Sequence, residues 1–414
     1  MSQFSFRPVL VAVPLLGAMH GAAAESPLAF AEAVELALAA PDPAVTRLAS
    51  RSAALDEAAV AAAQLPDPHV SGSLANLPVD SFRLDDAAMT QLKFGLRQEF
   101  PPGRTLEIRG QRQRDQAEAA RRQMGLEQRR IAREVRERWL DVQAHSRIGA
   151  IIARSADAVR RNIDSLSANF ATGRMNAQDA LRADLELALF EDQAIEHRRQ
   201  AEVARAGLQR FLGADAARPL PAALPQLPAP PPLAELLAAL PTHPLIAVRD
   251  AAVAVAGDDV ALAEQAYKPA FALEGSYGVR TDYADFASVG VSLSLPLFTS
   301  HRQDRGRAAA IHSLGAERLE RDLGLRELER ELREAYADWQ RLAERAQLYR
   351  ETVRVRARQT ADAAITTYAS DLTDFAELIR SELAELAVEV KQVELETAQA
   401  RAWARLEYLR GAAP

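Results

Sequence analysis

The sequence of 414 residues contains no cysteine, which excludes structural disulfides, thiolate chemistry, cysteine-based zinc sites and a lipidated N-terminal cysteine. Aromatic residues make up only 6% of the chain, while alanine, leucine, glutamate and arginine are abundant. That composition favours long helices over a compact mixed core. The net charge is −7 and there is no basic tail, so nucleic acid is not an expected partner.

Long hydrophobic runs are also missing beyond the first residues. Residues 1–24 have the pattern of a secretory signal peptide, with Arg7 before the apolar segment Val9–Met19 and small residues at Ala22–Ala24. A short buried helix is the alternative for this segment. After it, no stretch approaches the 18 apolar residues of a transmembrane helix. We therefore expect an exported chain that does not cross a membrane by helices.

The chain contains an internal repeat. The sequence that begins at Phe170 (Phe-Ala-Thr-Gly) recurs 198 residues later at Tyr368 as Tyr-Ala-Ser-Asp. At the same offset, three further pairs correspond: Asn176 and Asp374, Asp179 and Glu377, Gly213 and Gly411. We predict two structural repeats, residues 28–213 and 233–411, because a repeat of this kind indicates one structural unit used twice. Between them, 214–232 holds seven prolines and is expected to be an extended connector.

Four short segments alternate apolar and polar residues with a period of two, which predicts β-strands. They lie near residues 69–77, 90–100, 271–280 and 288–297. Each has about 10 residues, the length that a tilted strand needs to cross a bilayer. Two soluble hairpins with one dry face would give the same alternation. If the segments span a membrane, several chains must combine their strands, because four strands cannot close without open edges.

The remaining sequence predicts long helices. The runs from about 104 to 166 and from about 302 to 365 contain no proline and carry a narrow apolar stripe, which is typical of coiled-coil packing. A helix of some 62 residues would extend about 93 Å. Shorter helical runs are expected to stack end to end in pairs and cover the same distance: 178–212 with 233–266, and 28–64 with 374–410.

These features together resemble the TolC-type outer-membrane efflux proteins. The resemblance rests on the repeat, on a proline at the end of the second strand of each copy, Pro101 and Pro296, and on the turns after the long helices. The family's turns read aromatic, two residues, glycine. The turn at Phe170 fits, whereas the turn at Tyr368 has Asp371 in the glycine position. The segment 98–104 is similar to the branch that exports heavy-metal cations.

The resemblance implies a mainly α-helical fold with a transmembrane β-barrel contribution. It implies a homotrimer in the outer membrane of a Gram-negative bacterium, with twelve strands in one barrel surrounded by lipid and a hollow helical tunnel in the periplasm. The expected partners are a periplasmic membrane-fusion adaptor and an inner-membrane pump of the RND type. The protein would be a passive exit duct of a tripartite efflux system, with metal cations as a candidate cargo, and neither an enzyme nor a cofactor-binding protein.

The turns are the candidate functional sites. In the family they form the periplasmic tip, where the adaptor docks and the pore closes. The candidate tip residues are Gly173, Asn176, Asp179, Asp371, Asp374 and Glu377. Asn176 and Asp374 stand where each return helix starts, so simple helix capping is sufficient to explain them. In a trimer, Asp371 and Asp374 would instead form a carboxylate ring that favours cations.

The seven histidines are scattered and show no ligand spacing, so no metal site is expected. The motifs of nucleophilic triads and phosphate-binding loops are also missing, which argues against an exported enzyme. A soluble periplasmic coiled-coil scaffold or adaptor is the alternative to the exit duct. It requires the four strands to form soluble hairpins and does not explain their matching lengths.

Overall fold

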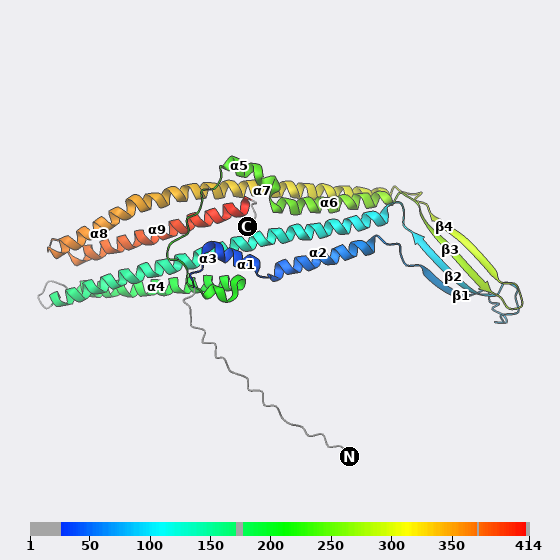
Figure 1. Cartoon of the computed structure of the whole chain (residues 1–414), viewed down its shortest axis with the longest axis horizontal. Coiled ribbons are helices and arrows are strands. Elements are labelled where there is room, and N and C mark those ends of the chain that lie inside the picture. Colours follow the sequence, from blue (N-terminus) through cyan, green and yellow to red (C-terminus); the bar gives the residue numbers. More distant parts are fainter. Residues whose placement is uncertain (1–25, 171–176, 371, 411–414) are drawn as a thin grey trace, which may run out of the picture.

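The computed structural model describes residues 26–170, 177–370 and 372–410. The predicted signal peptide therefore lies outside the described residues. The molecule is elongated, with four strands at one end and helices that run from them to the opposite end (Figure 1). We call that opposite end, where α3 meets α4 and α8 meets α9, the tip.

The four strands form one antiparallel sheet in the order β1-β2-β3-β4. Their bounds are His69–Ala75 for β1, Gln91–Phe100 for β2, Ala270–Val279 for β3 and Phe286–Ser294 for β4. The predicted fourth strand, 288–297, was misplaced by two to three residues. It ends earlier because Pro296 lacks an N–H group and restricts the residue before it. The β2–β3 pairing joins the two halves of the chain, so the strands are not two separate hairpins.

The two long helices differ in continuity. α3 runs unbroken from Thr105 to Phe170, which are 66 residues or about 99 Å. Its counterpart consists of α7, Gln303–Leu348, and α8, Arg354–Ala369, joined by one π-helical turn, Tyr349–Val353. One continuous helix was predicted here. The π turn contains the adjacent β-branched residues Thr352 and Val353, whose rotamers are restricted inside a regular helix.

The shorter helices are α1, Phe30–Ala39; α2, Pro43–Ala62; α4, Ala177–Leu212; α5, Leu233–Ala239; α6, Pro244–Gln265; and α9, Phe375–Leu409. 3₁₀ turns occupy Gly213–Ala217 and Leu240–Thr242. The predicted runs 28–64 and 233–266 are each broken in two. Prolines end the first helix of each pair. The second helix of each pair begins with a side-chain cap. Asp42 Oδ1 accepts a hydrogen bond from the N–H of Ala44 at 2.7 Å, and His243 Nδ1 accepts one from the N–H of Leu245 at 3.1 Å.

The predicted end-to-end stacking of the short helices was wrong in its pairing. α2 and α4 both pack along α3, with α2 on the sheet side and α4 on the tip side (Figure 1). α6 and α9 take the corresponding places beside α7 and α8. The chain connectivity explains this arrangement, because each short helix is joined to its long helix by a turn or a hairpin and sequential elements usually pack as neighbours.

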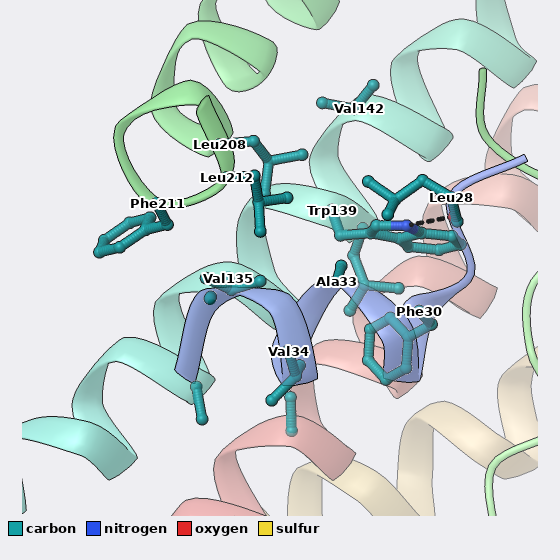
Figure 2. Close-up of a cluster of buried hydrophobic side chains, with 14 of the residues drawn as sticks. Leu28, Phe30, Ala33, Val34, Val135, Trp139, Val142, Leu208, Phe211 and Leu212 are labelled. Atoms are coloured by element: carbon teal, nitrogen blue, oxygen red, sulfur yellow. Dashed lines mark hydrogen bonds between the residues drawn. The ribbon is translucent and has the colours of Figure 1, made fainter. Parts of the chain in front are cut away.

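The largest buried cluster lies at mid-height, where α1 packs against α3. Trp139 is only 1% exposed and its indole N–H donates to the backbone oxygen of Leu28 at 3.0 Å (Figure 2). The Phe30 ring packs edge-on against the Trp139 ring, with centroids 5.2 Å apart. Leu208 and Leu212 of α4 close the cluster from another side. This cluster holds α1, α3 and α4 together at the middle of the molecule.

The proline-rich connector, residues 218–232, crosses the helices at the same height and is tied down by side chains. Gln143 Nε2 of α3 donates to the oxygen of Ala222, and Trp403 Nε1 of α9 to that of Pro228, both at 2.9 Å. The N–H of Leu28 donates to the oxygen of Pro219 at 2.8 Å. The connector therefore lies fixed along its length against both halves. The boundaries of the two predicted repeats stay a prediction.

Candidate functional site

The sheet has two chemically different faces. Directly opposed residues of antiparallel strands point to the same face. Phe94 lies opposite Gly72 and Tyr277, and Phe271 lies opposite Phe100 and Leu293. The apolar residues of all four strands therefore lie on the same face of the sheet. The exposed apolar side chains of this face are Val70, Leu74, Leu92, Phe94, Leu96, Phe271, Leu273, Tyr277, Val279, Val289, Val291 and Leu293.

The other face is polar and contains its own ion pairs. Arg97 and Glu274 are direct register partners, and Arg97 Nη1 lies 3.1 Å from Glu274 Oε1. Arg97 also pairs with Glu99 at 3.2 Å. Serines and glycines fill most of the other positions on this face, including Ser71 and Ser292. Small and charged side chains of this kind suit a surface in contact with water.

An exposed apolar face of this size requires a partner that is not water. Val289 is 88% exposed and Leu293 is 57% exposed. The outer strands β1 and β4 each have one neighbour, which leaves two edges with unpaired backbone groups. None of the described helices combines the length and the apolar character needed to cross a membrane. The apolar face and the two open edges of the sheet are thus surfaces that a partner other than water would stabilise.

The tip of the second half is described up to its helix cap. Asp374 is the N-cap of α9, and its Oδ1 accepts a hydrogen bond from the backbone N–H of Glu377 at 2.8 Å. Glu377 forms an ion pair with Arg380 one turn further on. The rings of Tyr368 and Phe375 meet edge to face across the turn, with centroids 6.1 Å apart. The predicted capping role of Asp374 is confirmed by this hydrogen bond.

The candidate tip residues other than Asp374 and Glu377 are not described by the structure. Gly173, Asn176 and Asp371 lie outside the described residues, as does the side chain of Asp179. The assignment of all six residues to a periplasmic gate therefore stays a prediction. In the described chain, α3 and α8 both end, and α4 and α9 both start, at the same end of the molecule, far from the sheet (Figure 1).

Two pairs of titratable side chains that meet at contacts between helices were not predicted from the sequence. His145 of α3 and His197 of α4 place their Nδ1 atoms 3.0 Å apart. Asp258 of α6 lies near Asp115 of α3, and burial together with that carboxyl raises the pKa of Asp258 to about 6. Both pairs are far apart in sequence, so a signal was available only from knowing which helices are neighbours. No group of three or more metal-ligating side chains occurs within the described ranges.

The comparisons with known proteins agree with this geometry. Residues 236–412 match the family described as outer membrane efflux protein. No curated protein matches the chain by sequence.

Several solved structures have the same fold. A structure of CusC, described in terms of folding and transmembrane channel formation, superposes with a TM-score of 0.78 at 15% identity over 93% of this chain and 92% of its own. VceC of Vibrio cholerae, an outer membrane protein, has a TM-score of 0.77 at 14% identity over 93% and 96%. The open MtrE outer membrane channel of Neisseria gonorrhoeae has a TM-score of 0.76 at 15% identity, over 93% of this chain and 89% of its own. At these identities the likeness shows the shared fold.

The fold and the two-faced sheet define a class of proteins in which long helices extend from a small antiparallel sheet with one apolar face. Together with the family match over 236–412, they confirm the resemblance to the TolC-type outer-membrane efflux proteins. The matched family is described as an outer membrane efflux protein, and MtrE as an outer membrane channel, which agrees with the predicted location in the outer membrane.

Proposed function

We propose that three copies of this chain form an outer-membrane exit duct for an efflux system. The observation that carries the proposal is the sheet, whose exposed apolar face and two unpaired edges are satisfied together if three sheets close into one twelve-stranded barrel in lipid. The polar face, with the Arg97–Glu274 pair, would then line the water-filled interior. The helices would continue this passage into the periplasm.

The partners follow from the family resemblance. A periplasmic membrane-fusion adaptor would dock near the tip, and an inner-membrane pump of the RND type would supply the energy. Metal cations are the proposed cargo, because the segment 98–104 is similar to the heavy-metal branch of the family. The duct itself would carry out no chemistry, which agrees with a family of channels rather than of enzymes.

The tip residues would serve as the periplasmic gate of this duct. Asp374 caps α9 through one carboxylate oxygen, which leaves its negative charge in place near the turn. With Asp371 it would give six carboxylates close together in a trimer, an arrangement that favours cations. The soluble scaffold is the weaker alternative, because it would leave the apolar face of the sheet in water.

The proposal is tested by fractionation and sedimentation of the mature chain. We expect it in the outer-membrane fraction and, after extraction with detergent, as a trimer that forms ion-conducting pores in planar lipid bilayers. A monomer that stays soluble without detergent would reject the exit duct and favour the scaffold. A detergent-dependent trimer without conductance would reject the open duct while retaining the membrane assembly.

A further inference from the structure

A pair of histidines joins the two helices of the first tip hairpin. His145 of α3 and His197 of α4 are both half-buried, and their rings are 5.3 Å apart at an angle of 37°. Their Nδ1 atoms are 3.0 Å apart, so one donates a hydrogen bond and the other accepts it. The pair lies between two buried clusters, since Val142 belongs to the mid-height cluster and Ile148 to the cluster that continues toward the tip.

The separation of the two nitrogens matches that of two imidazoles on one metal ion. Metal–nitrogen bonds of about 2.0–2.1 Å to both atoms would enclose an angle of about 90–97°. This angle suits square-planar or tetragonal coordination and is within reach of a distorted tetrahedron. Each ring would coordinate as the tautomer with its proton on Nε2. The proton now shared between the Nδ1 atoms would move to Nε2 of its own ring, so the charge of the pair would not change.

The surroundings favour a neutral pair next to a positive ion. Partial burial lowers the pKa of His145, and proximity to His197 lowers it further; burial likewise lowers the pKa of His197. Both rings are therefore unprotonated at neutral pH and retain a lone pair for coordination. Among the groups that face the pair, the carboxylates Asp141, Glu196 and Glu394 contribute negative potential, and Arg401, ion-paired with Asp141, opposes it.

We infer that His145 and His197 together bind one divalent transition-metal ion, of the kind that prefers imidazole ligands, and that this ion cross-links α3 to α4. Zinc, copper and nickel have this preference. Water would complete the coordination, because the half-buried pair is open to solvent on one side. The bound ion would fasten the hairpin between the two clusters, independently of what the duct transports.

The inference is tested by equilibrium dialysis of Zn²⁺ against the untagged, detergent-solubilised trimer, because a polyhistidine tag would itself bind zinc. We expect one Zn²⁺ per protomer. His145→Ala or His197→Ala should each weaken binding at least about tenfold, as expected for loss of a ligand. The double variant should bind no more weakly than either single variant, since the site needs both rings. His312→Ala, which removes an exposed histidine of α7, is the matched control and should bind as the wild type does.

A second variant separates a metal site from a purely structural hydrogen bond. His145→Gln keeps a hydrogen-bonding partner for His197 but removes the imidazole ligand, so we expect an intact trimer without the zinc site. With Cu²⁺, electron paramagnetic resonance should show coupling to two imidazole nitrogens in the wild type and to one or none in His145→Gln. Absence of zinc binding by an intact wild-type trimer, or binding by the double alanine variant as tight as that of the wild type, would overturn the inference.

Discussion

The sheet and the helical bundle treat apolar side chains in opposite ways. In the bundle the apolar side chains gather in buried clusters, as Trp139 does with 1% of its surface exposed, and scattered ones such as Leu319 face solvent. In the sheet the strand residues on one face remain open, with Leu293 at 57% exposure and Val289 at 88%. Burial of apolar surface stabilises the bundle by about 25 cal/mol per Å², whereas the sheet face gains this stabilisation only from a lipid or protein neighbour.

This difference is what the proposed position of the sheet in lipid and of the helices in water requires of one chain. Most ion pairs of the chain lie on helices, where arginine and glutamate three or four residues apart pair on the solvated surface, as in Arg330 with Glu327. In the sheet, the charges are confined to the polar face around Arg97. The sequence thus changes its hydrophobic period from about 3.6 to 2 where the chain passes from the helices to the sheet.

The largest effect is expected from Trp139→Ala. It removes a fully buried side chain and leaves the carbonyl of Leu28 without its donor, so we expect about 3–5 kcal/mol of lost stability. Chemical unfolding followed by the helical circular dichroism signal measures it. Trp339→Ala is the control, because Trp339 of α7 is only half-buried. Equal losses for the two variants would contradict the burial difference.

Leu293→Arg tests the sheet side of the comparison. It places a charge on the apolar face, which costs about 2–4 kcal/mol if the position lies near the bilayer midplane. The neighbouring Ser292→Arg puts the same charge on the polar face and should assemble. Sedimentation of the two detergent-extracted variants measures this difference. We expect Leu293→Arg to lose the trimer and Ser292→Arg to retain it. Equal tolerance would mean that the apolar face is not embedded in lipid.

The Asp258–Asp115 contact makes the bundle sensitive to pH. The pKa of Asp258 is raised to about 6 in the folded chain, so its stabilising protonated form is fully present below the unfolded pKa and is lost as the pH rises through about 6. Allowing for solvent screening, we expect about 1 kcal/mol less stability at pH 8 than at pH 4 from this group.

Two neighbouring variants should change the unfolding midpoint at pH 8 in opposite directions. Asp258→Asn should abolish this pH dependence and raise the unfolding midpoint at pH 8. Asp259→Asn should instead lower it, because Asp259 forms an ion pair with Arg112 at 2.7 Å. Thermal unfolding at both pH values distinguishes the two. An unchanged pH profile in Asp258→Asn would show that this carboxyl does not titrate differently in the folded and unfolded states.

The smallest effect on stability is expected at the tip. Asp374→Ala should cost about 1 kcal/mol through loss of the cap, while Asp374→Asn should cost little because asparagine caps as well. Hydrogen exchange of the first turn of α9 measures this. Asp371→Asn combined with Asp374→Asn should lower the cation selectivity of single channels. Unchanged selectivity in an intact trimer would leave Asp374 with capping alone.

The strands and long helices were predictable because their patterns are local. Alternation gave the apolar face from Leu92 to Leu96 without knowledge of the register, and β2 begins and ends within one residue of the prediction. The cap at Asp374 was predictable for the same reason, since both partners lie within one turn. The family resemblance supplied what local patterns do not contain, namely how three chains would combine.

What escaped prediction depends on contacts between distant segments. The pairing of β2 with β3 and the meeting of His145 with His197 both depend on which elements become neighbours. The placement of α2 and α4 along the same long helix was not predicted, because matching helix lengths do not show which short helices share a long helix. The π turn at Tyr349–Val353 has neither proline nor glycine to mark it.

The connector at mid-height has a consequence for how such proteins vary in length. The connector, α1, α5 and the end of α9 all lie at the middle of the molecule (Figure 1). From there the described chain runs to either end and back, and at the sheet end β2 and β3 also pair across the two halves. Whole helical turns added equally to both arms of a tip hairpin would lengthen the protein without moving the connector. The distance that the molecule spans is thus adjustable by insertion, independently of how its halves are joined.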